Sequence, residues 1–251
     1  MSGHSKWHSI KHQKAVTDAR RGQLFTKLTR EIIVAVHNGG PNPDNNVSLR
    51  LAIQRARDAS MPSDNIERAI RRASGATEGA NLVEMVLEGY GPGGGAILVE
   101  ALSDNRNRTI QTVRHAFSRG GGSLGEAGCV AWQFAPKGIV TVQTEDEDTE
   151  KLALLAIDAG AEDVTVEAGM VQIYTKPGEL ERVRAALERE DITVASVEVS
   201  MVPKTTFELD EKAALQTLRL MERLDELDEV RRISSNVDFS DEVLAKLEEQ
   251  A

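Results

Sequence analysis

The sequence contains a single cysteine, Cys129, and no apolar run that approaches the length of a membrane span. One cysteine cannot form a disulfide within the chain, and it cannot build a zinc site from several thiolates. A membrane-spanning helix needs about 20 apolar residues, and residues 1–14 are too polar and basic for a secretory signal. We therefore expect a cytoplasmic protein, in a reducing compartment, with no membrane partner.

The residue patterns of enzymes and cofactor sites are also missing. The sequence has two glycine-rich runs: residues 91–95 join two expected strands, and residues 120–125 follow an expected helix. Neither fits a nucleotide-binding loop, which places its glycines between a strand and a helix. His4, His8 and His12 have a ligand-like spacing, but the lysines around them would repel a divalent cation. The sequence therefore predicts no enzyme, and no cofactor, metal or small-molecule substrate.

Charge is distributed unevenly along a chain whose net charge is −10. Residues 1–80 carry 13 basic and 7 acidic side chains, a net of +6, while the remaining residues carry 17 basic and 33 acidic ones, a net of −16. This asymmetry predicts a basic binding surface on a body that repels phosphate elsewhere. The alternative is an ordinary acidic protein with a slightly basic start.

The positive charge is densest in the first thirty residues, where seven lysines and arginines face only one acidic residue, Asp18. Cations offset phosphate charge, and the rings of tryptophan and histidine stack on bases. Arginines on a later expected helix extend this basic segment. The expected nucleic-acid-binding residues are Lys6, Trp7, His8, Lys11, His12, Lys14, Arg20, Arg21, Lys27, Arg30, Arg68, Arg71 and Arg72. A solvated tail is the alternative for the segment up to Lys14.

A second basic cluster begins a later helix, expected from about Arg106 to Ser118. Arginines are unusual in the first turn of a helix, because the free backbone amides there already present positive charge. Arginine side chains and free amides in one turn together form a site for an anion. The candidate phosphate-binding residues are Arg106, Arg108 and Arg114, and His115 would broaden the site. Pairing of these arginines with acidic side chains of the β-rich units is the alternative.

Hydrophobic spacing predicts an α+β fold with an N-terminal three-helix domain. The helices are expected near 17–36 and 48–60, with a third that begins at the capping-box pattern Asp64-Asn65-Ile66-Glu67. The chain then reads as two ferredoxin-like α/β domains, one inserted in the other. The expected domains are 1–80 (basic arm and helices), 81–135 plus 204–251 (discontinuous α/β domain) and 136–203 (inserted ferredoxin-like domain).

Within the α/β region, strand, helix, strand, strand, helix and strand follow one another between 139 and 201, the order of a ferredoxin-like unit, with its two middle strands expected at 163–167 and 170–175. The flanking segments supply four more strands, expected at 82–88, 96–102, 129–134 and 230–237. They also supply helices near 106–118 and 210–224, and a last helix is expected over 240–251. Residues 120–125 are expected to form a mobile loop.

Several motifs, in this order, resemble the YebC/PmpR family over essentially the whole chain. They are Gly3-His4-Ser5-Lys6-Trp7, Ile10-Lys11-His12, Phe25-Thr26-Lys27, the run from Met61 to Ile70, the run from Glu88 to Gly94, and the run from Ser103 to Arg108. The resemblance implies an N-terminal helical domain followed by two α/β domains. It also implies a DNA-binding transcriptional regulator, which is how members are generally described.

Two other functions remain open at this point. Relatives in the family include a mitochondrial translational activator of cytochrome oxidase subunit I and bacterial proteins linked to relief of ribosome stalling, so a translation factor that contacts rRNA or tRNA is the first alternative. A basic aromatic arm suits structured RNA as well as a DNA groove. No helix-turn-helix is evident, because the link at Met61-Pro62 lacks glycine. A protein-interaction module without affinity for nucleic acid is the second alternative.

Overall fold

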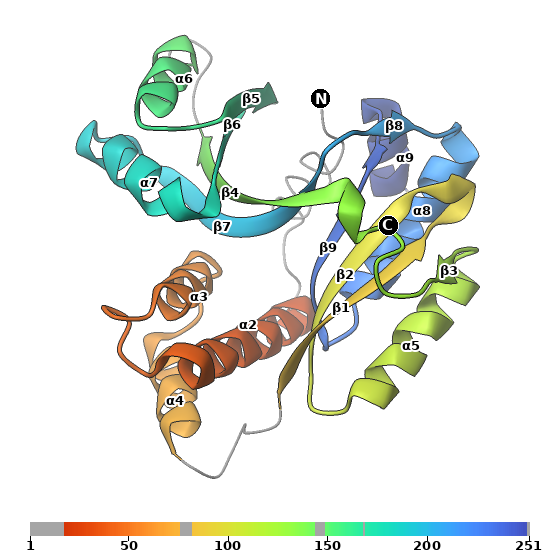
Figure 1. The fold of residues 1–251 in the computed structure, drawn as a ribbon, viewed down its shortest axis with the longest axis horizontal. Coiled ribbons are helices and arrows are strands. Elements are labelled where there is room, and N and C mark those ends of the chain that lie inside the picture. The colour runs from red at the N-terminus through yellow and green to blue at the C-terminus, as the bar shows by residue number, and fades with distance from the viewer. Residues whose placement is uncertain (1–17, 76–81, 144–148, 168, 250–251) are drawn as a thin grey trace.

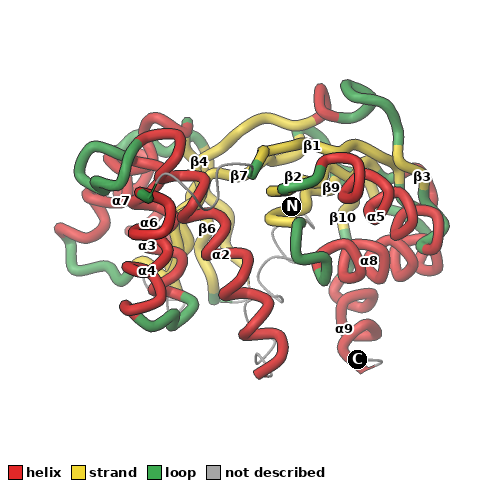
Figure 2. Tube along the Cα trace, turned by 90° about the horizontal axis from the view of Figure 1, so that it is seen from below, coloured by secondary structure: helices red, strands yellow, loops and turns green. Residues whose placement is uncertain are grey.

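The computed structural model describes residues 18–75, 82–143, 149–167 and 169–249. The fold is α+β, as predicted: a helical N-terminal part precedes two four-stranded antiparallel sheets (Figure 1). Figure 2 shows the second sheet beside the N-terminal helices, and the first sheet on the other side with its own helix layer. The domain boundaries expected from the sequence remain a prediction.

The N-terminal part consists of helices α2 (Asp18–Gly39), α3 (Val47–Asp58) and α4 (Ser63–Ser74). Their apolar faces meet in one core, which includes Leu28, Ile32, Leu49, Ala56 and Ile66. The predicted capping box of α4 is wrong, because the helix begins at Ser63 with Pro62 in the N-cap position and no side-chain cap. The Pro62 carbonyl instead accepts the Asn65 amide at 2.9 Å.

The first sheet has the strand order β3-β1-β2-β9. Its helices α5, α8 and α9 share one core with it, which contains Phe117, Leu218, Met221 and Phe239. The glycine-rich run between β1 and β2 forms a tight turn in which Gly93 has a φ of 75°. The bounds are β1 (Val83–Tyr90), η1 (Pro92–Gly94), β2 (Ala96–Ser103), α5 (Arg106–Arg119), β3 (Ser123–Leu124), α8 (Glu211–Asp225), β9 (Val230–Ser235) and α9 (Asp241–Glu249).

The second sheet has the order β5-β6-β4-β7 and the β-α-β-β-α-β sequence of elements that was predicted. Helices α6 and α7 pack against it around Val140, Ile173, Val183 and Leu187. The bounds are β4 (Phe134–Gln143), α6 (Thr149–Asp158), β5 (Asp163–Glu167), β6 (Met170–Thr175), η4 (Pro177–Glu179), α7 (Leu180–Arg189) and β7 (Val194–Pro203). A short parallel pair, β8 (Phe207–Glu208) with β10 (Val237–Asp238), completes the strands of the described residues.

The strand predicted at 129–134 is wrong. Residues Ala131–Gln133 form a 3-10 turn, η2, and β4 begins only at Phe134. The first sheet obtains its fourth strand from β3, in the segment expected to be a mobile loop. Pro136 lies within β4 and is paired with Met201 of β7. Pairing of β4 with β6 starts only at Gly138, so no strand pairs with Pro136 on its other side. A proline is tolerated there because no second strand needs its missing N–H.

Glu88 on β1 explains the conformation of residues 128–131. Its buried carboxylate accepts the amides of Gly128 (2.6 Å), Val130 (2.8 Å) and Ala131 (2.7 Å). Burial alone would raise the pKa of Glu88, but these three hydrogen bonds to the charged form outweigh it and lower the pKa. Three amides that point at one carboxylate cannot belong to a regular strand.

A buried ion network joins the three parts of the molecule. Arg232 of β9 is 6% exposed and lies 2.7 Å from Glu198 of β7 and 4.0 Å from Glu100 of β2. Nearby, Arg55 of α3 pairs with Glu31 of α2 at 2.9 Å. Burial lowers the pKa of Arg55 more than Glu31 raises it, whereas the two acidic partners of Arg232 overcome burial and raise its pKa.

We predict that Glu88→Gln destabilises the protein by about 1–3 kcal/mol at neutral pH, because the amide cannot accept all three hydrogen bonds. A carboxylate with a lowered pKa stabilises the fold above its unfolded pKa, about 4.3, and this stabilisation is lost as the pH falls through the folded pKa. The difference from wild type in urea unfolding should therefore shrink below about pH 4. Glu84→Gln, at an exposed position on the same strand, is the control; an equal, pH-independent loss in both variants contradicts the assignment.

A second prediction concerns the ion network. Arg232→Met removes the cation that lies 2.7 Å from the part-buried Glu198, leaves Glu100 paired with Arg231 alone, and should cost about 3 kcal/mol in chemical unfolding. The control is Arg182→Met, which breaks a pair with Glu179 whose side chains are 63% and 41% exposed and should cost under about 1 kcal/mol. Glu198→Gln serves as a milder variant if Arg232→Met does not fold. Equal losses for buried and exposed variants would show that the network does not hold the parts together.

Candidate nucleic-acid interface

The described residues contain only part of the predicted basic surface. Lys6, Trp7, His8, Lys11, His12 and Lys14 lie outside the described residues, as does the side chain of Arg20. Arg21, Lys27 and Arg30 lie along α2, and Arg21 is exposed. Arg68, Arg71 and Arg72 lie on α4, and all three are exposed. The two helices therefore bring together two groups that are about forty residues apart in sequence.

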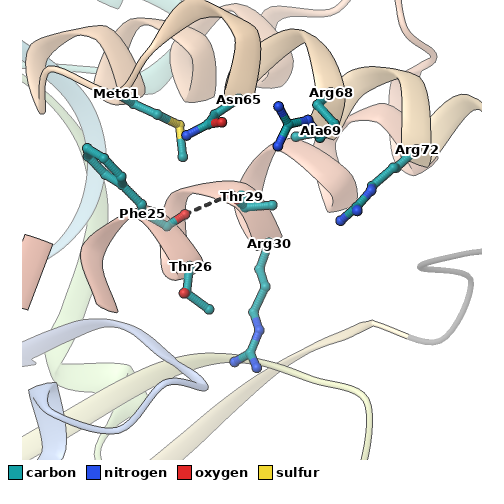
Figure 3. A pocket seen from close by; sticks show the side chains of 9 residues that line it. All are labelled: Phe25, Thr26, Thr29, Arg30, Met61, Asn65, Arg68, Ala69 and Arg72. Atoms are coloured by element: carbon teal, nitrogen blue, oxygen red, sulfur yellow. Dashed lines mark hydrogen bonds between the residues drawn. The ribbon is translucent and has the colours of Figure 1, made fainter. Parts of the chain in front are cut away.

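An open cavity of about 420 Å³ lies between α2 and α4 (Figure 3). Arg68 and Arg72 border it from α4, and Arg30 extends from α2 on the side away from α4. Thr29 lies between Arg30 and Arg68, and Phe25, Met61 and Asn65 line the other end of the cavity. The full lining is Phe25, Thr26, Thr29, Arg30, Met61, Asn65, Arg68, Ala69 and Arg72.

The orientation of the α4 arginines follows from the spacing of its apolar residues. Ile66, Ala69 and Ala73 are buried at intervals of three and four residues, which turns the positions between them toward solvent. Within the part of the chain that the structure describes, the side chains of Arg68, Arg71 and Arg72 have no hydrogen-bond or ion-pair partner. Arginines held in this way are available to an anionic ligand.

The chemistry of the cavity suits a nucleotide better than a metal or a simple anion. Cationic guanidinium groups at the rim match phosphate oxygens. The half-buried Phe25 offers apolar surface for a base beside the buried Met61, and Asn65 carries both a donor and an acceptor. The arginines were predicted from the sequence, but Phe25, Met61 and Asn65 were not. Phe25 and Thr29 are four residues apart, as are Asn65 and Ala69, and this spacing places each pair on one face of its helix.

Lys27 and Arg30 are directed toward the protein. The Lys27 ammonium contacts Asp225, with 3.6 Å to its carboxylate and a hydrogen bond to its backbone carbonyl. Arg30 donates a hydrogen bond of 2.7 Å to the Asp228 carbonyl. Lys27 therefore attaches α2 to the end of α8, and Arg30 attaches it to the link between α8 and β9. A count of charges along the sequence cannot distinguish this role from phosphate binding.

In the second predicted cluster, on α5, one arginine is paired within the protein and the other two are exposed. Asn105 caps α5 by accepting the Arg108 amide at 3.1 Å. Arg108 pairs with Asp104 at 2.7 Å and with Glu229 at 3.4 Å, the acidic pairing raised as an alternative in the sequence analysis. Arg106 and Arg114 are exposed and have no such partner among the residues described.

A further cavity, of about 530 Å³, lies beside β4, β5 and β6. Its two lysines are already engaged: Lys137 pairs with Glu162, and Lys204 donates to the Trp132 carbonyl at 2.8 Å. Lys137 also lowers the pKa of Glu162, chiefly through its hydrogen bond. The cavity between α2 and α4 is therefore the better candidate for a phosphate ligand.

The described residues contain no group of three or more histidine, cysteine, aspartate or glutamate side chains placed to hold a metal ion. A search of the same residues for a helix long and apolar enough to cross a membrane finds none.

Comparison with known proteins identifies the family. Residues 5–76 match the TACO1/YebC protein N-terminal domain, and residues 82–237 match the TACO1/YebC second and third domain. The protein therefore belongs to the TACO1/YebC family, which confirms the resemblance seen in the sequence.

Close relatives and a solved structure agree with this assignment. The chain is 57% identical over its whole length to the "Probable transcriptional regulatory protein cbdbA400" of Dehalococcoides mccartyi, which it covers completely. It is 49% identical to a "Probable transcriptional regulatory protein" of Pelotomaculum thermopropionicum, over 96% of this chain and all of that one. The crystal structure of "a Conserved Hypothetical Protein Aq1575 from Aquifex Aeolicus" superposes with a TM-score of 0.84 at 44% identity, covering 90% of this chain and 94% of that one.

Proposed function

We propose that this protein is a regulator of transcription that binds DNA through the α4 arginines and the cavity between α2 and α4. The observation that carries the proposal is the group of exposed, unpaired arginines Arg68, Arg71 and Arg72 on a chain whose net charge is −10. Cations that form no internal ion pair are available to phosphate. The names of the relatives, probable transcriptional regulatory proteins, support the same function.

The link between α3 and α4 supports duplex DNA as the ligand. The two helices are joined by the four residues 59–62, the turn length of helix-turn-helix units. Ser60 has a φ of 58° there, so it adopts the left-handed conformation that glycine usually supplies. A helix-turn-helix is not evident from the sequence because this turn contains no glycine. In such units the second helix, here α4, enters the major groove.

The acidic remainder of the molecule contributes by repulsion. Residues 81–251 carry 17 basic and 33 acidic side chains, so most of this part repels the phosphate backbone. Nucleic acid is therefore admitted in few orientations. On this proposal Lys6, Trp7, His8, Lys11, His12 and Lys14 extend the contact from the first residues of the chain, and the protein acts in the cytoplasm without catalysis or a cofactor.

The third prediction tests the α4 surface directly. Arg68→Ala/Arg72→Ala should weaken binding to duplex DNA about tenfold or more at low salt. It should also make the plot of log affinity against log salt shallower by about 2, since each lost phosphate contact removes about 0.9. The matched control is Arg182→Ala/Arg189→Ala, two exposed arginines on α7. Fluorescence anisotropy at several salt concentrations measures both quantities.

Three outcomes would change the proposal. Equal behaviour of the α4 and α7 variants would remove α4 from the interface. Co-sedimentation with ribosomes that is lost on removal of residues 1–20, together with no affinity for duplex DNA, would replace DNA by ribosomal RNA and make the protein a translation factor. Failure to bind either nucleic acid would leave a protein-interaction module.

A further inference from the structure

Helix α5 has a composition unlike the rest of the α/β region. Its fourteen residues, Arg106–Arg119, include four arginines and one histidine but no aspartate or glutamate. The region around it is strongly acidic, with 33 acidic against 17 basic side chains over residues 81–251. An amphipathic helix that only needed a solvated face would carry both signs, as α7 does with its pairs between arginine and glutamate.

The basic side chains of α5 lie on its solvent face. Thr109, Val113, Ala116 and Phe117 are buried, and the helix packs against β1 and α8. The opposite side carries the exposed residues Arg108, Gln111, Arg114, His115 and Arg119. Arg119 lies in the last turn, where the helix dipole favours a cation, but Arg114 and His115 have no such reason to be basic. Among the residues that the structure describes, the side chains of Arg114, His115 and Arg119 have no hydrogen-bond or ion-pair partner.

The link between α8 and β9 connects this face to the cavity between α2 and α4. Asp228 accepts a hydrogen bond from Arg30 of α2 at 2.7 Å, and its neighbour Glu229 pairs with Arg108 of α5 at 3.4 Å. Glu229 is itself fixed, since its carbonyl accepts the Leu102 amide at 2.8 Å. In Figure 1, α4 and the first turn of α5 both lie on the lower side of the molecule, α4 at the left and α5 at the right.

We propose that the solvent face of α5 is a second phosphate-binding surface, and that it continues the α4 surface into one track along a nucleic-acid duplex. The ligand class rests on the proposed function. The fourteen residues of α5 extend about 21 Å, which corresponds to about six base pairs at about 3.4 Å each. The twelve residues of α4 add about 18 Å, or about five base pairs, so a duplex that lies along both helices needs at least about eleven base pairs.

The test uses the full chain and duplexes of two lengths, 8 and 24 base pairs. Arg114→Ala/Arg119→Ala should lower the affinity for the 24-base-pair duplex about tenfold, because two phosphate contacts are lost. The loss on the 8-base-pair duplex should be smaller, since that duplex fits on α4 alone. Arg182→Ala/Arg189→Ala on α7 is again the control and should change neither affinity.

The outcomes separate this inference from the proposed function. Unchanged affinity for the long duplex in Arg114→Ala/Arg119→Ala, with a loss in Arg68→Ala/Arg72→Ala, overturns the α5 surface and leaves the α4 surface standing. Absence of duplex binding by the wild-type protein overturns the proposed function itself. Poly-glutamate is a second probe. If Arg114→Ala/Arg119→Ala keeps its affinity for DNA but loses binding to poly-glutamate, the inference is also overturned, and α5 is assigned to an acidic protein partner.

Discussion

The relative placement of the three parts depends on one buried cation, Arg232. Its guanidinium contacts Glu198 of the second sheet and Glu100 of the first, and Glu31 of α2 is close enough to influence its pKa. A buried pair of this kind adds little net stability, because desolvation offsets the Coulomb attraction; its effect is a large penalty for any arrangement that separates the partners. The network therefore favours one arrangement of the two sheets, and the charges of Arg55 and Glu31 on the N-terminal helices lie close enough to Arg232 to interact with it.

Sequence patterns predicted the elements whose signals are local. Strands β5 and β6 have the predicted bounds, because alternating apolar residues and flanking turn residues define them within a few positions. The failures depend on contacts far apart in sequence. β3 has only two residues and no periodicity, and the turn at Ala131–Gln133 follows from Glu88, about forty residues earlier. Neither contact can be inferred from a window of neighbouring residues.

The same limit applies to the candidate site. Positive charge is visible in the sequence but its partners are not, so Lys27 and Arg30 were predicted to act together with Arg68 and Arg72. Contacts with Asp225 and Asp228, almost two hundred residues away, give the first two a role in holding α2 against the first sheet. The α4 arginines have no comparable contact among the described residues. The contacts of each basic side chain thus distinguish cations that hold the fold together from those that are available to a ligand.

The central claim is that a rigid junction presents α4 and α5 to one duplex at the same time. Site-specific photocrosslinking tests it most directly, with Glu67→Cys on α4 and Gln111→Cys on α5 labelled in turn in a Cys129→Ala background. Both positions are exposed in the structure. The account predicts that both cross-link to the same 24-base-pair duplex, at sites separated by a constant number of base pairs. Cross-links from only one position, or from neither, would contradict it.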